Sequence, residues 1–235
     1  MAAESLPAAR VVEIFSSLQG EGLYLRERQI FLRLGGCNLH CDYCDEPETI
    51  PLSSGKVMSL TSVQRRIESL QKSSRPESVS ITGGEPLLHW NFLLSLLPWI
   101  KSRGLGTYLE TNGTLTQALD KLERHVDRIA MDIKLPSATG RDLWHLHREF
   151  LRRFHSKSFV KVVLTEVSAE PEWERAVALI AEVSRDVPLF LQPATEVAGI
   201  LPLDPARVQK YYEHAKKSLT RVKVLPQQHP LWGLP

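Results

Sequence analysis

The stretch FLRLGGCNLHCDYCD, residues 31–45, contains all three cysteines of this 235-residue chain. Cys37, Cys41 and Cys44 follow an apolar run with the spacing C-x3-C-x2-C, which is too tightly bunched for a disulfide framework. Thiolates are soft ligands that suit zinc or iron–sulfur clusters, and a cluster held entirely by protein normally needs four of them. Three cysteines therefore predict a metal centre with one iron left open to another ligand.

Short apolar runs alternate with amphipathic segments along the rest of the chain. A helix is predicted to begin after Asp204, because Pro205 suits the first helical position, and another surrounds Trp173. The expected strands, each a short apolar run, cover residues 11–15, 29–34, 79–82, 107–110, 128–133, 159–164, 189–192 and 221–225. This alternation predicts an α/β fold of parallel βαβ units, with functional residues on loops at the carboxyl ends of the strands.

The composition favours one compact domain that acts on small molecules. Lys and Arg number 29 against 27 Asp and Glu, so the net charge of +2 gives no general attraction to nucleic acid or to an anionic membrane. No repeat or linker divides the chain, which predicts a single domain over residues 1–235, and residues 46–59 have the irregular composition of a loop. The chain lacks a bilayer-length apolar stretch and begins without a signal pattern, so we expect a cytoplasmic protein.

Glycine-rich and polar motifs follow four of the predicted strands. Residues 82–86, Thr-Gly-Gly-Glu-Pro, lack a Cβ atom at two positions, which lets backbone carbonyls approach a ligand closely. Residues 110–113, 132–137 and 192–195 end later strands with carboxylate, lysine, amide and hydroxyl groups. Each motif alone is also compatible with an ordinary capped turn. Because the motifs lie at the ends of successive strands, together they predict that polar groups face one pocket at the carboxyl edge of the sheet.

These motifs in combination resemble the radical S-adenosylmethionine (SAM) superfamily. The shared features are the cysteine spacing, the aromatic Tyr43 before the third cysteine, and the Gly-Gly-Glu-Pro motif downstream. The resemblance implies an α/β fold of the partial (β/α)6 radical SAM barrel type, with shortened or missing helices. It also implies a [4Fe–4S] cluster on the three cysteines, carried by a loop at 35–47, whose open iron binds SAM. Reductive cleavage of SAM would then generate the radical that attacks the substrate.

The N-terminal segment narrows the resemblance to one family. Residues 13–22 (EIFSSLQGEG) and 31–39 (FLRLGGCNL) are similar almost residue for residue to the opening of 7-carboxy-7-deazaguanine synthases, and the similarity resumes at 132–136 and 224–229. The resemblance implies a Mg²⁺-dependent lyase that contracts the ring of 6-carboxy-5,6,7,8-tetrahydropterin to 7-carboxy-7-deazaguanine with loss of ammonia. It further implies a role in queuosine or other 7-deazapurine biosynthesis, a homodimer, and an electron donor such as flavodoxin.

The same resemblance implies which residues form the site. Arg33 would pair with the substrate carboxylate, a task that suits a guanidinium fork. Contacts with the substrate are expected from Leu18, Gln19, Gly20, Arg33, Thr82 and Pro235, the last at the end of a tail (226–235) that closes the site. Catalytic roles are expected for Glu21, Arg33, Glu110 and His229. Contacts with SAM are expected from Tyr43, Cys44, Asp45, Gly84, Lys134, Leu135, Pro136, Gln192, Pro193, Ala194 and Thr195.

One position departs from the family pattern. The third cysteine of these synthases is often followed by Asp-Thr, with the Thr hydroxyl binding Mg²⁺, whereas this chain has Asp45 and Glu46. A carboxylate is a stronger ligand for a hard cation than a hydroxyl. Glu46 is therefore the candidate Mg²⁺ ligand. The alternatives are that Glu46 swings away or that its charge replaces part of the role of the cation.

Two other functions are compatible with the cysteine motif. The first is a radical SAM activase of a glycyl-radical enzyme, although residues 13–22 and the tail suit a small polar ring better than a peptide. The second is a non-catalytic zinc or iron–sulfur module, with His40 or His89 completing a zinc site. Separately, the basic residues between 141 and 157 are expected on the solvated face of a helix, or else in a docking patch for an acidic electron donor.

Overall fold

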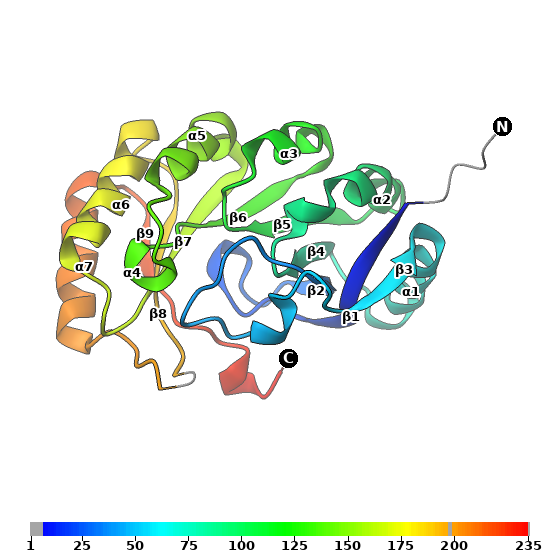
Figure 1. Cartoon of the computed structure of the whole chain (residues 1–235), viewed down its shortest axis with the longest axis horizontal. Helices are drawn as coiled ribbons and strands as arrows, with labels where there is room; N and C mark the ends of the chain where they lie inside the picture. The colour runs from blue at the N-terminus through cyan, green and yellow to red at the C-terminus, as the bar shows by residue number, and fades with distance from the viewer. Residues whose placement is uncertain (1–6, 197–198, 235) are drawn as a thin grey trace.

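The structure, a computed structural model, describes residues 7–196 and 199–234, and this part of the chain contains one curved sheet (Figure 1). Its strands are β1 (Ala8–Leu18), β2 (Arg28–Leu34), β3 (Lys56–Ser59), β4 (Ser78–Gly83), β5 (Gly106–Thr111), β6 (Arg128–Asp132), β7 (Ser158–Leu164), β8 (Leu189–Pro193) and β9 (Val222–Val224). Their spatial order is β3-β1-β2-β4-β5-β6-β7-β8-β9. Neighbours from β2 to β9 run parallel, while β1 and β3 add an antiparallel edge. The sheet is thus an open partial barrel, which confirms the predicted fold class.

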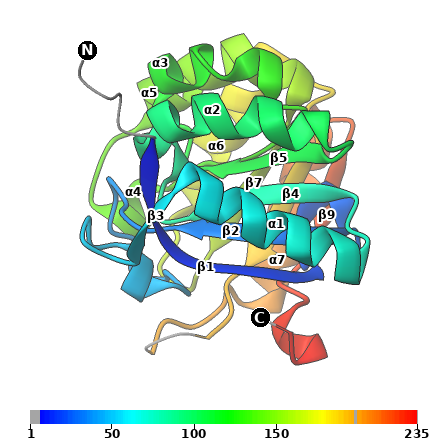
Figure 2. The same cartoon turned by 90° about the vertical axis from the view of Figure 1, so that its right-hand side faces the viewer.

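Helices connect the parallel strands and cover the outer face of the sheet. They are α1 (Leu60–Ser74), α2 (Trp90–Ser102), α3 (Thr116–Asp120), α4 (Pro136–Thr139), α5 (Trp144–Phe154), α6 (Glu170–Val183) and α7 (Pro205–Ser218). Short 3-10 turns are η1 (Gly22–Tyr24), η2 (Pro47–Thr49), η3 (Pro86–His89), η4 (Glu123–His125), η5 (His155–Lys157) and η6 (Pro230–Trp232). α3 has five residues and α4 has four, so shortened helices are present as expected. Figure 2 shows α1 and α2 side by side against the strands.

The predicted strands are all present, but one strand was missed. Residues 56–59, expected to lie in a loop, form β3 and pair with β1. The prediction was wrong because this short edge strand has two exposed residues in a row and lacks the alternating apolar pattern of a half-buried strand. The predicted start of α7 is confirmed, because the Asp204 carboxylate accepts hydrogen bonds from the backbone N–H groups of Ala206 and Arg207.

The core occupies both faces of the parallel strands. Phe92, Phe150 and Trp173 are buried between the sheet and its outer helices, while Tyr108 and Phe159 form a smaller apolar cluster of their own. Every residue of β7 is buried. Burial on both faces explains why these strands read as continuous apolar runs. None of the helices within 7–196 and 199–234 is long and apolar enough to cross a membrane.

Two glycines let the end of β4 pack directly against the end of β2 and the cysteine loop (residues 35–47). A Cβ atom on Gly83, where φ is +120°, would lie 2.0 Å from the carbonyl oxygen of Leu34. A Cβ atom on Gly84 would lie 2.2 Å from the carbonyl oxygen of Gly36. The sequence suggested that these glycines admit a ligand. The structure shows that they also admit the backbone of the cysteine loop, which locks the two motifs together.

Candidate active site

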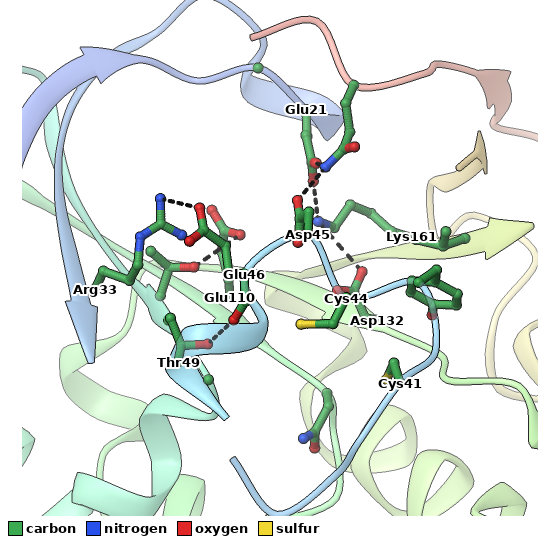
Figure 3. Close-up of a pocket in the computed structure, with 18 of the residues that line it drawn as sticks. Glu21, Arg33, Cys41, Cys44, Asp45, Glu46, Thr49, Glu110, Asp132 and Lys161 are labelled. Carbon is green, nitrogen blue, oxygen red and sulfur yellow. Dashed lines mark hydrogen bonds and ion pairs between the residues drawn. The ribbon is translucent and has the colours of Figure 1, made fainter. Parts of the chain in front are cut away.

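A pocket opens at the carboxyl ends of the parallel strands (Figure 3). It encloses about 1330 Å³, part of which is open to solvent. Its walls come from the turn after β1, the ends of β2, β4, β5, β6 and β8, the middle of β7, the cysteine loop and the C-terminal tail. The fold therefore gathers motifs that are far apart in the sequence into one site, as expected for strand ends that share an edge.

The three cysteines line one wall of this pocket. Cys37, Cys41 and Cys44 are partly exposed free thiols. Burial raises the pKa of each thiol, that of Cys44 to about 11, although the nearby Lys134 ammonium opposes the shift. At neutral pH the metal-free site thus carries protonated thiols, and a metal centre must displace these protons. Three soft donors on one wall of an open pocket fit an iron–sulfur cluster with one free iron.

Neither histidine considered for a closed zinc site points into the pocket. His40 is exposed. His89 donates from Nε2 to the carbonyl oxygen of Gly35 at 2.7 Å, since a carbonyl can only accept, and this contact uses one ring nitrogen. Neither residue belongs to the pocket wall over the described ranges. The zinc alternative therefore loses both of its expected fourth ligands.

Contacts on two sides hold the cysteine loop in place. The Tyr43 ring is buried against Ala138, while the backbone N–H of Asp42 donates to the Ala138 carbonyl at 3.1 Å. On the other side of the loop, Asn112 Nδ2 donates to Asn38 Oδ1 at 2.9 Å. Asn112 belongs to the polar motif at the end of β5 and Ala138 lies in α4, so the loop is tied to the end of β5 and to the helix that follows β6.

Glu85 of the glycine-rich motif joins this motif to the end of β5. Its carboxylate is fully buried and accepts hydrogen bonds from Thr111 Oγ1 at 2.9 Å and from the Asn112 N–H at 2.8 Å. Burial raises the pKa of Glu85 to about 7, although these hydrogen bonds favour the ionised form. Glu85 lies behind the pocket wall, so it positions the two motifs instead of contacting a ligand.

Arg33, near the end of β2, is held between two carboxylates (Figure 3). Its Nε donates to Glu13 Oε1 at 2.7 Å, and its Nη2 lies 2.9 Å from Glu46 Oε1. Burial and a hydrogen bond with Glu48 raise the pKa of Glu46 to about 8, and attraction to Arg33 opposes this shift. The guanidinium that the resemblance assigns to a substrate carboxylate is thus occupied by carboxylates of the chain itself.

Lys161 is the centre of a buried charge network. It is 5% exposed and forms ion pairs with Glu21 and, at 3.5 Å, with Asp132, which also accepts from Lys134 at 3.1 Å. Burial alone would raise the pKa of Glu21, but attraction to Lys161 and hydrogen bonds from Lys161 and Gln227 outweigh it and lower the pKa to about 2. Burial would lower the pKa of Lys161, but the surrounding carboxylates raise it overall. Both groups are therefore charged at neutral pH.

Lys161 was missed by the sequence prediction, although the sequence carries a signal for it. The run 159–164, FVKVVL, places one lysine in the middle of an otherwise apolar strand. In a parallel sheet covered on both faces, such a lysine has to find buried acceptors. A charged residue inside a predicted buried strand is therefore a candidate site residue.

Glu110, at the end of β5, forms another wall of the pocket. Its carboxylate accepts hydrogen bonds from Gln19 Nε2 at 3.1 Å, Ser80 Oγ at 3.0 Å and Thr82 Oγ1 at 3.4 Å. Burial raises the pKa of Glu110, with attraction to Lys161 opposing the shift. Gln19 is 3% exposed. Its side chain therefore orients Glu110, while Glu110 presents its remaining lone pairs to the pocket.

Most of the predicted site residues line this pocket. They are Leu18, Gln19, Gly20, Glu21, Arg33, Cys37, Cys41, Tyr43, Cys44, Asp45, Glu46, Thr82, Gly84, Glu110, Lys134, Gln192, Ala194, Thr195 and His229. Leu135, Pro136 and Pro193 are absent from the pocket wall as far as the structure describes it; Leu135 is fully buried and Pro136 begins α4. Their contacts with SAM stay predictions, and Pro235 lies outside the described residues.

The basic segment 141–157 contains α5. Arg148 and Arg152 pair with Glu182 of α6 at 3.1 and 2.6 Å, so part of the positive charge expected in a docking patch is neutralised. His147 is fully buried, and burial lowers its pKa to about 4. The prediction of a solvated face is therefore wrong for His147, which lies on the apolar side of the helix.

The C-terminal tail returns from β9 toward the cysteine loop, as the red segment of Figure 1 shows. The backbone N–H of Gln228 donates to the carbonyl of Gly20 at 3.0 Å. A Cβ atom on Gly20 would lie 2.7 Å from the His229 ring, so a glycine is needed for this close contact. Gln227 and His229 line the pocket, and Gln227 was also missed by the sequence prediction.

Comparisons with known proteins agree with this site. Residues 31–168 match the family model described as the radical SAM superfamily. The chain is 40% identical to the 7-carboxy-7-deazaguanine synthase of Geobacter sulfurreducens, over 97% of this chain and 99% of that protein. It is 32% identical to the synthase of the same name from Methanopyrus kandleri, over 96% of this chain and 94% of that protein. Its fold is similar to the crystal structure of QueE from Escherichia coli, with a TM-score of 0.63, 22% identity, and coverage of 92% and 93% of the two chains.

Proposed function

Because this chain belongs to the 7-carboxy-7-deazaguanine synthase family of radical SAM enzymes, we propose that it converts 6-carboxy-5,6,7,8-tetrahydropterin to 7-carboxy-7-deazaguanine with loss of ammonia. The observation that carries the proposal is the pocket, in which three cysteines share one cavity with an arginine and buried carboxylates. The similarity spans nearly the full length of both chains. It therefore favours the synthase over an activase of a glycyl-radical enzyme and over a non-catalytic metal module.

The residues of the pocket fit the cofactors of the family. Cys37, Cys41 and Cys44 would hold the [4Fe–4S] cluster, and Gly84 and Thr195 are among the groups that would contact SAM. Together these cofactors supply a one-electron route to hydrogen abstraction from the substrate. The protein provides the thiolates, the backbone and hydroxyl partners, and a site shielded from water.

The remaining pocket residues would orient the substrate. Arg33 offers guanidinium N–H groups to a carboxylate, and Glu110 offers acceptors to the guanidine-like edge of a pterin ring. Glu21 and Lys161 form a fixed pair of charges whose positions are set before the substrate arrives. His229 and the rest of the tail would exclude water from the loaded site.

Mg²⁺ is the third cofactor that we propose, with Glu46 as its protein ligand. A carboxylate oxygen is a suitable donor for this hard cation. In the structure Glu46 lies 2.9 Å from Arg33, so that cation binding through Glu46 requires the release of this ion pair. Arrival of the substrate carboxylate at Arg33 would free Glu46 for that role.

The family resemblance supports several further properties that we propose for this chain. They are a single domain over residues 1–235, a homodimer, a location in the cytoplasm, an electron donor such as flavodoxin, and a product that serves queuosine or another 7-deazapurine. The single sheet that runs through the described residues supports the single domain.

The test is a product analysis. The chain is reconstituted anaerobically with iron and sulfide and incubated with SAM, Mg²⁺, dithionite and the tetrahydropterin acid. We expect the mass of 7-carboxy-7-deazaguanine and release of ammonia. The proposed substrate would be contradicted by a preparation that forms none of this product although it shows the absorbance of an intact cluster and cleaves SAM.

A further inference from the structure

Gln227, in the C-terminal tail, connects three separate walls of the pocket through one amide. Its Nε2 donates to Glu21 Oε1 at 2.8 Å and to Asp45 Oδ2 at 2.7 Å. Its Oε1 accepts a hydrogen bond from the Thr195 hydroxyl. A primary amide has two N–H donors and one carbonyl acceptor, so each of its polar groups has a partner. Figure 3 shows Glu21 and Asp45 facing each other at this point of the pocket.

The three partners of Gln227 belong to two functional sides of the site. Glu21 pairs with Lys161 in the buried charge network, and its Oε1 also accepts from Gln192 Nε2 at 3.2 Å. Under the proposed function, Glu21 lies on the substrate side. Asp45 follows the third cysteine, and Thr195 follows β8, so both belong to the side expected to contact SAM.

The backbone around Gln227 is attached on both sides. The N–H of Leu225 donates to the carbonyl of Leu191 in β8 at 3.0 Å, and the N–H of Gln228 donates to the carbonyl of Gly20 at 3.0 Å. Two residues further on, the tail continues into η6. These two backbone hydrogen bonds fix where the tail crosses the pocket, and Gln227, which lies between them, transmits a shift of Asp45 or Thr195 to this tail segment.

The chemistry of the side chain matters because two of its partners are carboxylates. An amide donates to both without adding charge, and hydrogen bonds to ionised acceptors are stronger than neutral ones. A carboxylate of the same size could not donate to either partner and would repel both. The contact thus depends on an amide at this position and not only on its shape.

We propose that Gln227 is a positioning residue that couples binding of SAM to closure of the C-terminal tail over the substrate side of the pocket. This inference rests on the proposed function, which assigns Glu21 to the substrate side and Asp45 and Thr195 to the SAM side. The SAM side, through Asp45 and Thr195, orders Gln227, and Gln227 in turn holds Glu21 and the tail in place. With SAM bound, the tail then shields from water the substrate side of the pocket, where hydrogen abstraction would take place.

A near-isosteric variant with a matched control tests the coupling. Gln227→Glu removes both donors and adds a negative charge, whereas Gln228→Glu makes the same change at the next residue, whose side chain donates to the Pro226 carbonyl within the tail. Hydrogen exchange of tail amides, including those of Leu225 and Gln228, is measured on the cluster-loaded protein with and without SAM. We expect SAM to slow this exchange about tenfold in the wild type and in Gln228→Glu but not in Gln227→Glu.

Turnover gives a second, independent readout. We expect Gln227→Glu to raise the KM for the tetrahydropterin acid about tenfold, because loss of the two hydrogen bonds opens the site. For the same reason we expect the variant to release more 5′-deoxyadenosine per molecule of product. A merely structural role would lower kcat without changing this ratio. If Gln227→Glu fails to fold or to load its cluster, Gln227→Ala, which adds no charge, takes its place with the same expected direction.

The outcomes separate this inference from the proposed function. In one outcome the wild type makes the expected product, and a Gln227 variant keeps both the tail protection and the wild-type ratio of 5′-deoxyadenosine to product. This outcome overturns the coupling and leaves the proposed function intact. In another outcome the wild type makes no such product, but SAM protects the tail amides of the wild type and not those of the Gln227 variant. This outcome overturns the proposed substrate and supports the coupling.

Discussion

The carboxylate of Glu46 lies 2.9 Å from Nη2 of Arg33, on the guanidinium that would bind the carboxylate of the proposed substrate. Glu13 accepts from Nε of the same side chain at 2.7 Å. Hydrogen bonds between a guanidinium and a carboxylate are strong, and the Nε and Nη2 groups of Arg33 are both engaged before a ligand arrives. Under the proposed function Glu46 is therefore an internal competitor of the substrate, at the position where the sequence departs from the expected family pattern.

Replacing Glu46 should expose this competition. At about pH 9, where Glu46 with its pKa of about 8 is ionised, we expect Glu46→Thr to lower the Kd for 6-carboxypterin, an oxidised analogue of the substrate, about tenfold in the absence of Mg²⁺. The reason is that one competing carboxylate is removed from Arg33. Quenching of pterin fluorescence measures the Kd. Asp42→Thr removes a carboxylate from an exposed position of the same loop and should leave the Kd unchanged. Equal Kd values for wild type and Glu46→Thr would show that Glu46 does not compete with the ligand for Arg33.

Cluster binding should depend on each thiolate. We expect Cys41→Ser to abolish the brown chromophore after reconstitution, since a hydroxyl is a poor ligand for iron compared with a thiolate. The metal-free variant should unfold at the same temperature as the metal-free wild type, because Cys41 lies on a partly exposed loop outside the main core. Absorbance, iron content and circular dichroism measure these properties, and retained iron would argue against the ligand assignment.

The buried network should be sensitive to loss of its cation. Lys161→Met leaves Glu21 and Asp132 without their shared ammonium, and we expect the free energy of unfolding to fall by about 3 to 5 kcal/mol. Urea denaturation measures the loss. Lys223→Met, an exposed position in β9, serves as the control and should have little effect. The second change Glu21→Gln should recover part of the loss in Lys161→Met, and no recovery would mean that charge burial is not the cause.

Acid should weaken the fold through Glu21. Its pKa is lowered from 4.5 to about 2, so the folded state favours the ionised form. The stabilisation is fully present above the unfolded value and is lost as the pH falls from about 4.5 toward about 2. We expect Glu21→Gln to be less stable than the wild type by up to about 3 kcal/mol near neutral pH, and the difference to shrink through this window. Urea titrations at several pH values, with the exposed Glu166→Gln as control, measure it.

Local patterns were enough to predict the strands and the α/β class, and the resemblance to radical SAM proteins added the partial barrel and the expected cluster chemistry. Apolar runs of strand length determine where buried strands form, and the cysteine spacing places three soft ligands within one loop. The missed strand β3 shows the limit of this reasoning. It is an edge strand with exposed side chains, so its pairing with β1 depends on a neighbour and not on its own pattern.

The partners of the polar site residues could not be derived from the sequence in the same way. Glu21 pairs with Lys161 at a separation of 140 residues and with Gln227 at a separation of 206. The residue types and their places at strand ends were visible in the sequence, but which carboxylate meets which cation depends on how the sheet curves and where the tail returns.

The sequence by itself thus determined the grouping of three cysteines in one loop, the order of strands and helices, and the family, because these depend on residue types and spacings within short segments. Only the tertiary structure decided that Glu46 lies against Arg33, that Lys161 pairs with Glu21 and Asp132, and that Gln227 joins Glu21 to Asp45 and Thr195. Hydrogen bonds and ion pairs act over a few ångströms, so their partners are set by the folded arrangement of distant segments and not by the segments themselves.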